Sequence, residues 1–349
     1  MVAETPSPEE WRALYAAAMR LYALHPWTWL YEDQILGVVN PENGEVGYCS
    51  VMGSLDQHLA LAVYLGDEGF DSFLNLRDAE GEWDTVEAFI RQKALQASFE
   101  SREMLTEEDR QVIRGLGLKF RGRQAWPLFR DHSPGYFPWY LTASQARFLT
   151  LALEQTAEVA ARFRDNPAEW PTVDAAEDLL VRVPEPGPAG LTWREERRPL
   201  PAGIPTPELA CSWEADIEET LRRKSPKMKR QGALEIDTFY LPTAVQDQPG
   251  ERPFHPQMLL AADHGSGFIL SQEMISPGML GDALVKMVQG LLLEGLATWP
   301  RQIGVRREEL ARVLDGLVGP LGIEVLEVED LPAISLYRQM LAEWSRWGR

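Results

Sequence analysis

Two aspartates in the C-terminal half of the chain are the residues whose type and setting could support catalysis. Asp216 lies in the stretch Trp213-Glu214-Ala215-Asp216, which we expect to be a strand, and Asp263 ends a second expected strand. Two-metal phosphoryl transfer needs several carboxylates that converge on the cations. With a nearby glutamate, Asp216 and Asp263 could therefore hold Mg²⁺ in a nuclease or phosphotransferase.

Both aspartates also have an ordinary structural explanation. Asp216 belongs to an acidic segment, residues 214–219, that solvent would surround. Asp263 precedes His264-Gly265-Ser266-Gly267, and an aspartate in such a turn commonly accepts hydrogen bonds from nearby backbone N–H groups. We favour the structural interpretation and keep the two aspartates as the candidate catalytic residues.

The other residue types that bind metals or attack substrates form no recognisable motif. His264 and His255 could suggest a metal or acid–base pair, but the sequence has no zinc-binding spacing such as H-E-x-x-H. Cys49 could be a nucleophile if His58 approached it, yet a free cysteine is more often a small buried side chain. Walker, dinucleotide-binding and nucleophile-elbow motifs are missing too. We therefore predict neither a metal nor a cofactor.

Aromatic residues gather in a stretch with interspersed prolines, residues 126–140, that we expect to be a loop. Its members include Trp126, Phe129, Tyr136, Phe137 and Trp139. Exposed aromatic side chains mark interaction surfaces, but such loops also fill gaps in a core. Both interpretations stay open, and these five residues form the candidate interaction surface.

A basic segment, Arg222–Arg230, stands out in an acidic chain. Six of its nine residues are lysine or arginine. These side chains could contact phosphate groups, or they could neutralise the glutamates nearby. We favour the second interpretation because the chain as a whole carries a formal charge of −19.

The elements that would position Asp216 and Asp263 lie between Ser212 and Asp330. Two apolar runs flank the turn at 263–267 and predict a hairpin. Ser276-Pro277 then opens an amphipathic helix. A strand at Gln302–Val305, a second helix and a strand at Ile323–Val328 follow. This order predicts an α/β domain with a mixed sheet and flanking helices, closed by a helix over Pro332–Trp347.

The N-terminal half predicts a compact α+β unit. Ser7-Pro8-Glu9-Glu10 has the form of a capping box and opens a helix. Strands are expected at Gln34–Val39, Val46–Met52 and His58–Leu65, and a turn containing Asn43-Gly44 joins the first two. Helical segments are expected over Gly66–Leu76, Trp83–Phe99, Thr106–Gly115 and Thr142–Asp165.

A change in composition marks the expected domain boundary. Seven prolines fall between Val183 and Glu208, and such a density favours extended backbone and suits a linker. We therefore assign residues 1–182 to the α+β region, 183–208 to the linker and 209–349 to the α/β domain.

Length and charge limit the class of protein. A chain of 349 residues suggests two or three domains, and 45% hydrophobic residues can form substantial cores. No run of 18 apolar residues predicts a membrane span, and no secretory signal is visible. The two segments 1–207 and 208–349 carry net charges of −13 and −6, which argues against nucleic acid as a partner. We expect a cytoplasmic protein with no disulfide framework.

Two blocks of the chain resemble a known family. The block from Trp27 to Gly66, with P-W-T-W-L-Y-E-D-Q-I-L-G-V-V-N-P-E-N-G, is similar to the N-terminal domain of an uncharacterised bacterial family. The block from Trp213 to Pro332 is similar to the C-terminal domain of the same family. This resemblance implies a bacterial origin and two domains of unknown function, and it implies no chemistry.

The C-terminal block also resembles the ribonuclease H-like fold of transposases and retroviral-type integrases. In that fold the first catalytic carboxylate lies on the W-x-x-D strand, which here implies Asp216. The second follows the strand after the proline, where this chain has Val305-Arg306-Arg307. Glu308 and Glu309 are the nearest residues to a third. Because an arginine pair adds positive charge where a cation should bind, the resemblance implies a site without catalysis.

These observations predict a non-catalytic cytoplasmic binding or scaffold protein with a protein or small-molecule partner. The alternative is a divalent-metal-dependent nuclease or phosphotransferase that uses carboxylates of the C-terminal domain. Three carboxylates within reach of one metal would favour the enzyme. Arg306 or Arg307 pointing into that site would favour the binding protein. Small-molecule sensing by the N-terminal unit is a third hypothesis.

Overall fold

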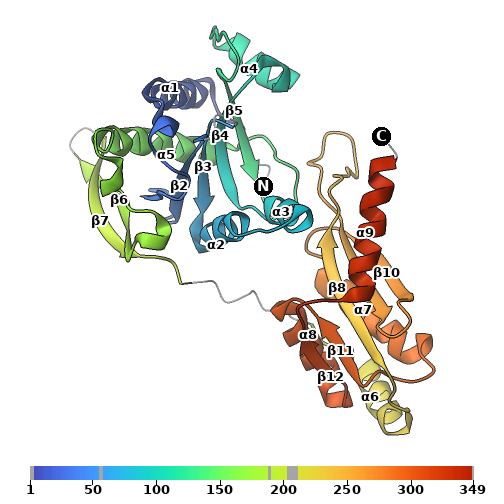
Figure 1. Ribbon diagram of the computed structural model, residues 1–349. Helices are drawn as coiled ribbons and strands as arrows, with labels where there is room; N and C mark the ends of the chain where they lie inside the picture. The colour runs from blue at the N-terminus through green and yellow to red at the C-terminus, as the bar shows by residue number, and fades with distance from the viewer. Residues whose placement is uncertain (1–3, 55–57, 188–189, 203–210, 348–349) are drawn as a thin grey trace. The chain divides into compact units, whose positions relative to one another are not determined.

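A computed structural model of the chain describes residues 4–54, 58–187, 190–202 and 211–347 (Figure 1). The chain divides into two compact units, Met1–Ile204 and Pro205–Arg349. Each unit has its own sheet and its own apolar core. The prediction of two domains that both mix helices with strands is therefore confirmed.

The N-terminal unit is built on a sheet that has seven strands within the described residues, in the order β5-β4-β3-β2-β1-β6-β7. Neighbouring strands are antiparallel except β1 and β6, which are parallel. The three expected strands form its centre as β1, β2 and β3. The strands are β1 Leu36–Val39, β2 Val46–Met52, β3 Ala60–Leu65, β4 Ala94–Glu100, β5 Trp126–His132, β6 Asp178–Gly187 and β7 Gly190–Pro199.

Helices cover both faces of this sheet. The helices are α1 Pro8–Leu24, α2 Gly66–Arg77, α3 Glu82–Ile90, α4 Glu107–Gly115 and α5 Ala143–Arg162. On one face α1 and α5 lie together, as Figure 1 shows, and bury Leu14, Leu149 and Leu153. On the other face α2 buries Phe70 and Phe73 against Tyr48 and Tyr64. Every strand of the sheet centre is thus buried on both sides.

Capping boxes set the start of three of these helices. Ser7 begins α1, Thr106 begins α4 and Thr142 begins α5. In each case the side-chain oxygen accepts a hydrogen bond from the third helical residue, whose own side chain accepts one from the cap. The expected start of α1 is confirmed.

The prediction of a linker from residue 183 is wrong for the described part of that stretch. Residues 183–187 and 190–199 belong to β6 and β7, which pair with each other along their whole length. β6 pairs with β1 only as far as Arg182. Pro184 and Pro186 lie beyond that point, where one edge of β6 has no neighbouring strand and a missing N–H is tolerated. Residues 200–202 form neither helix nor strand, and residues 188–189 and 203–208 of the expected linker lie outside the described residues.

Two further stretches differ from expectation. Residues 126–132, expected as part of a loop, form β5 and pair with β4. The expected helix over 83–99 ends at Ile90, and β4 follows from Ala94. In both stretches the residues pair with a neighbouring strand of the sheet and are partly buried. Pairing and burial override the local conformational propensity, so these residues form strands.

The C-terminal unit contains a mixed sheet of five described strands in the order β10-β9-β8-β11-β12. β8, β9 and β10 form an antiparallel meander, and β11 lies parallel to β8 and β12. β8 is therefore central. The strands are β8 Ala233–Tyr240, β9 Gln257–Asp263, β10 Ile269–Ile275, β11 Gln302–Val305 and β12 Glu324–Glu327.

The helices of this unit divide between the faces of its sheet. They are α6 Ala215–Lys224, α7 Leu280–Gly290, α8 Glu308–Val318 and α9 Pro332–Trp347, with a π-type turn at Leu291–Gly295. α7 and α8 bury Leu284, Leu310 and Leu314 against Ile236 of β8. α9 contacts β8 and β9 and runs beside them in Figure 1. The predicted mixed sheet with flanking helices is confirmed.

The expected strand around Asp216 is wrong, because Ala215–Lys224 is the helix α6. Its first turn carries Asp216 and Glu218, and its last turn carries Arg222 and Arg223. Acidic residues at the N-terminus and basic residues at the C-terminus complement the helix dipole. Ile217 and Leu221, four residues apart, turn one side of the helix to the core.

None of the helices among the described residues has the length and apolar character needed to cross a bilayer.

Candidate functional site

The structure places Asp216 and Asp263 in separate settings. Asp216 is exposed in the first turn of α6, and its carbonyl oxygen accepts a hydrogen bond from Thr220. Asp263 ends β9, where its Oδ1 accepts hydrogen bonds from the Ser266 N–H (2.7 Å) and hydroxyl (2.6 Å). These bonds hold the pKa of the Asp263 carboxyl below its usual value. Within the described residues, no three His, Cys, Asp or Glu side chains are grouped to hold a metal ion.

Replacing Asp263 with alanine should therefore weaken the β9–β10 hairpin. The turn loses two hydrogen bonds to a carboxylate, and we expect the free energy of unfolding to fall by about 1 kcal/mol. Urea unfolding of the variant measures this. If Asp263 were instead a metal ligand, the variant would lose a Mg²⁺-dependent thermal shift that the unchanged protein shows.

The buried acidic residues of the C-terminal unit lie on its central strand. Glu235 and Asp237 are two residues apart on β8 and therefore share the sheet face that α9 covers. They are 1% and 0% exposed. Buried carboxylates need partners, because an isolated charge is very costly away from water.

Arg306 and Arg307 supply the partners of Asp237. Arg306 Nε donates to Asp237 Oδ2 at 3.0 Å, and Arg307 Nε lies 3.5 Å from Asp237 Oδ1. Both arginines follow directly after β11, which pairs with β8. The carboxylate is therefore held between two guanidinium groups, an arrangement that leaves little electrostatic attraction for a divalent cation.

Glu235 is bound in a similar way. Its Oε1 lies 2.7 Å from His264 Nδ1, and its Oε2 accepts a hydrogen bond from the N–H of Ile334 in the first turn of α9. A carboxylate at a helix N-terminus is favoured by the helix dipole. This contact joins α9 to the centre of the sheet.

Cys49 is a buried residue of the N-terminal sheet. It lies on β2, is 1% exposed, and burial raises the pKa of its thiol to about 12. Only the thiolate is reactive. The interpretation of Cys49 as a core residue therefore holds.

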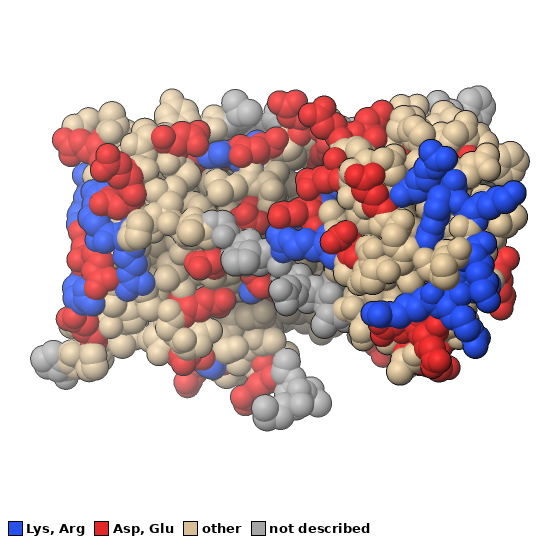
Figure 2. Space-filling model, turned by 90° about the horizontal axis from the view of Figure 1, so that it is seen from below, with Lys and Arg blue, Asp and Glu red and all other residues tan. Residues whose placement is uncertain are grey.

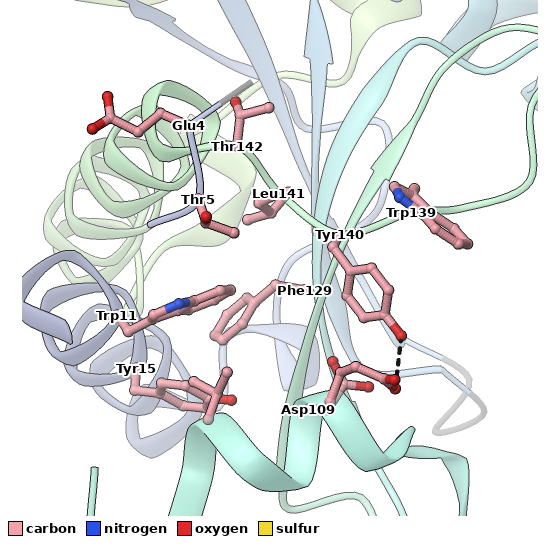
Figure 3. A pocket seen from close by; sticks show the side chains of 12 residues that line it. Glu4, Thr5, Trp11, Tyr15, Asp109, Phe129, Trp139, Tyr140, Leu141 and Thr142 are labelled. Carbon is pink, nitrogen blue, oxygen red and sulfur yellow. Dashed lines mark hydrogen bonds between the residues drawn. The ribbon is translucent and has the colours of Figure 1, made fainter. Parts of the chain in front are cut away.

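A pocket of about 410 Å³ opens in the N-terminal unit (Figure 3). Five segments meet there: residues 4–5, the first half of α1, the start of α4, β5 and the segment that leads into α5. Its volume lies in the range of small-molecule sites. The lining residues are Glu4, Thr5, Trp11, Tyr15, Glu108, Asp109, Val112, Phe129, Trp139, Tyr140, Leu141 and Thr142.

Aromatic rings form most of the pocket wall. Trp11 and Tyr15 lie on one side, Tyr140 lies on the other, and Phe129 lies between them in Figure 3. Phe129 packs edge-on to Tyr15 at 5.0 Å between ring centroids and lies 6.2 Å from Trp11. Trp139 is edge-on to Tyr140 at 5.1 Å. Rings fixed in this way can receive an apolar or cationic group without rearranging.

The charged residues of the pocket lining are all acidic. Glu108 lies in the first turn of α4, where the Tyr140 hydroxyl is 3.2 Å from its Oε2 (dashed in Figure 3). Hydrogen bonds from its own backbone N–H, from Thr106 and from Tyr140 hold the pKa of the Glu108 carboxyl below its usual value. Glu108 is therefore ionised at neutral pH.

Asp109 is the acidic residue with a basic partner. Arg130 donates two hydrogen bonds to its carboxylate, at 2.9 and 2.6 Å. The same guanidinium lies 4.9 Å from the centre of the Tyr140 ring. Arg130 thus neutralises Asp109 and supports Tyr140 from a position that does not line the pocket. Glu108 and Glu4 supply the net negative charge.

The five residues of the candidate interaction surface do not form one surface. Phe129 and Trp139 line the pocket. Trp126 packs against Phe120 at the other end of β5. Tyr136 and Phe137 are exposed in the segment between β5 and α5. Of these five residues, the pocket therefore takes two, Phe129 and Trp139.

Sequence reasoning missed the rest of the pocket. In the sequence, Trp11 and Tyr15 share the apolar face of one helix and Glu108 and Asp109 lie in the first turn of another, so no local pattern joins the four residues. Tyr140 belonged to the aromatic stretch without being singled out. On β8 a signal did exist: Glu235 and Asp237 alternate with Leu234, Ile236 and Thr238, which points two acids to one face of a buried strand.

Comparisons with known proteins identify two domains. A family model described as Domain of unknown function (DUF7309) matches residues 11–182. A second, described as Domain of unknown function (DUF6930), matches residues 220–342. No curated protein and no solved structure matches the chain. The two matched regions fall in the two structural units, so each unit is similar to one of these two domains of unknown function.

Proposed function

We propose that this protein is a non-catalytic binding protein and that its N-terminal unit binds a small ligand, or the side chain of a partner, in the aromatic pocket. The observation that carries the proposal is the enclosure of about 410 Å³ by five aromatic rings and three carboxylates. Ligand sites combine an apolar wall with a few polar groups that fix orientation. Trp11, Tyr15 and Phe129 would supply the wall, and Glu108 the orienting charge.

The ligand class that fits this lining is an apolar or aromatic group that carries a positive charge. Cations are attracted to the faces of tryptophan and tyrosine rings, by about 0.5–2 kcal/mol depending on desolvation. Glu108 adds a carboxylate next to the Tyr140 ring. No lysine or arginine is among the described residues that line the pocket. An anionic ligand would be repelled by Glu4 and Glu108, and no basic side chain of the described pocket lining would offset that repulsion.

The arrangement around Asp237 supports a binding role over the metal-dependent alternative. Two-metal catalysis requires carboxylates with free oxygen atoms facing the cations. Asp237 is paired with Arg306 and Arg307, and Asp216 and Asp263 lie elsewhere. We therefore propose no phosphoryl-transfer activity for the C-terminal unit.

A ribonuclease H-like fold of the C-terminal unit is part of the proposal. It is supported by an antiparallel meander followed by helix, strand, helix and strand, with the first strand at the centre. In that fold the first strand carries the first carboxylate. The residue at that place would be Asp237 on β8 rather than Asp216, and Arg306 and Arg307 would follow the strand where the second carboxylate belongs.

We further propose a cytoplasmic, bacterial protein whose partner is not nucleic acid. Cys49 and Cys211 are both free thiols, which suits a reducing compartment. A net charge of −19 opposes general attraction to a phosphate backbone.

Titration with three monosubstituted benzenes of similar size tests the pocket. Benzylamine is cationic, benzyl alcohol neutral and benzoate anionic at neutral pH. We expect benzylamine to bind the full chain most tightly and benzoate not to bind, as measured by isothermal titration calorimetry. Replacing Glu108 with glutamine should weaken benzylamine binding by about fivefold, since a partly screened ion pair contributes about 1 kcal/mol.

The control is Glu107→Gln, the same change one residue earlier on α4. Glu107 is exposed, pairs with Arg110 and Arg114, and does not line the pocket. It should leave the affinity for benzylamine unchanged. Equal affinity for all three compounds would contradict the proposed preference for a cationic ligand. If none of the three binds, the proposal that this pocket binds a ligand is wrong.

A further inference from the structure

The basic segment Arg222–Arg230 does not serve mainly to neutralise nearby glutamates. Arg222 pairs with Glu218, one turn earlier on α6, at 2.6 Å. Arg223, Lys227 and Lys229 are exposed and form no ion pair with any described carboxylate. Figure 2 shows lysine and arginine side chains gathered on the C-terminal unit in the view from below. The expected neutralising role is wrong for these three residues.

Two other cations of the segment fix its backbone. Lys224 Nζ donates to the carbonyl oxygen of Leu293 at 2.7 Å. The guanidinium of Arg230 donates to Ser225 Oγ at 2.8 Å and to the carbonyl oxygen of Leu321, and it lies 4.8 Å from the centre of the buried Trp299 ring. The segment is therefore anchored at Lys224 and at Arg230, and its exposed cations project from a fixed backbone.

A fourth exposed cation joins them across the chain. The Trp299 N–H donates to the carbonyl oxygen of Lys229 at 2.9 Å, and the Arg301 N–H donates to that of Gly232 at 3.0 Å. These bonds place Arg301 beside the basic segment. Arg301 is exposed and has no carboxylate partner among the described residues. We call Arg223, Lys227, Lys229 and Arg301 the basic surface.

The lack of ion pairs here needs an explanation, because carboxylates are in excess. The chain has 53 acidic and 34 basic residues, and many of its arginines are paired. The dipole of α6 accounts for basic residues in its last turn, such as Arg223. It does not account for Lys227, Lys229 or Arg301, which lie outside α6.

We propose that the basic surface binds a short acidic peptide segment of a partner protein. Four like charges on a fixed backbone repel one another and gain from an anionic partner. A short segment with a few carboxylates can contact the basic surface without extending beyond it. The proposal is independent of the aromatic pocket, which lies in the other unit.

The surroundings of the basic surface favour a short acidic segment over nucleic acid. Glu218 and Glu219 precede it on α6, and Glu324 donates its N–H to the carbonyl oxygen of Arg301. A longer phosphate backbone would extend over these carboxylates. Trp299, the ring that Arg230 covers, is 0% exposed and offers no face for a base to stack on.

Fluorescence anisotropy with three labelled probes tests the proposal on the full chain. The probes are an octaglutamate peptide, an octameric oligouridine and a neutral Gly-Ser octapeptide. We expect the octaglutamate to bind most tightly, and to bind more weakly as salt is raised because the contacts are exposed. The double variant Lys227→Glu/Lys229→Glu should weaken it by about tenfold or more.

The matched control is Arg12→Glu/Arg20→Glu, which makes the same charge change on α1 of the N-terminal unit and should leave octaglutamate binding within about twofold. Because Lys227 and Lys229 are exposed, the variant should keep the circular dichroism spectrum of the unchanged protein; Lys227→Gln serves as a milder second variant. Tighter binding of oligouridine, equal loss in both double variants, or no binding of octaglutamate would each overturn the proposal.

Discussion

Replacing Arg306 with alanine is expected to lower the free energy of unfolding of the C-terminal unit by about 3 kcal/mol. Removing one partner of a buried ion pair costs about 3–5 kcal/mol, because the other charge is left without compensation. Asp237 is 0% exposed and receives its 3.0 Å hydrogen bond from Arg306. Arg307 remains 3.5 Å away on the other carboxylate oxygen, so the loss should fall at the lower end.

Hydrogen exchange of the β8 amides measures this loss within the full chain, since exchange reports on each unit separately. The control is Arg312→Ala, which breaks an exposed pair with Glu308 on α8 and should cost less than about 1 kcal/mol. If both variants exchange alike, the pairing of Asp237 with Arg306 is not a determinant of stability.

A second comparison separates the charge pair from the packing. In Asp237→Leu/Arg306→Met/Arg307→Met the carboxylate and both neighbouring guanidinium groups are removed together, and apolar replacement of a buried ion pair is often neutral or stabilising. We expect this triple variant to be more stable than Arg306→Ala alone. A triple variant as unstable as the single one would show that packing, not the uncompensated carboxylate, causes the loss.

Replacing Asp109 with alanine is expected to destabilise the N-terminal unit by about 3 kcal/mol. Its carboxylate accepts a hydrogen bond from the N–H of Thr106 in the capping box of α4, and losing a cap costs about 1 kcal/mol. The same carboxylate holds Arg130 with two hydrogen bonds in a pair whose side chains are only 13% and 11% exposed. Losing that pair leaves Arg130 without its counter-charge.

Urea unfolding followed by hydrogen exchange in α4 and β5 measures the loss. Asp109→Asn is the informative comparison, because an amide can still accept the hydrogen bond from Thr106 but no longer carries the charge that Arg130 needs. We expect the asparagine variant to lose less stability than the alanine variant. Both should weaken benzylamine binding, since Tyr140 and Glu108 depend on this arrangement. Unchanged ligand binding in either variant would mean that Asp109 does not support the pocket.

The surroundings of Asp263 and Asp216 explain why a structural role suits both residues. Asp263 accepts hydrogen bonds from Ser266 within its own turn. Asp216 lies in the first turn of a helix, where the helix dipole favours an acidic residue. The residues that the fold does bring together, Asp237 with Arg306 and Arg307, come from strands that are far apart in sequence but adjacent in the sheet. There the single carboxylate of Asp237 lies against two guanidinium groups.

Several elements were predictable because their signals are local. The turn at 263–267, the strand Gln302–Val305 and the helix Pro332–Trp347 follow from turn residues, apolar spacing and a proline start. The capping box at Ser7 likewise fixes the start of α1 within four residues. A signal that fits inside one turn or one strand needs no knowledge of the rest of the chain.

The sequence by itself determined the local elements, the acidic character and the arginine pair that follows β11. Only the tertiary structure decided which residues meet. Sheet pairing converted residues 126–132 and 183–187 into strands, and it brought Asp237 beside Arg306. The pocket needed α1, α4, β5 and the approach to α5 in one place. The contact between Asp237 and Arg306 joins residues 69 positions apart, and the pocket joins Glu4 to Thr142. No periodicity within a short window encodes such distances.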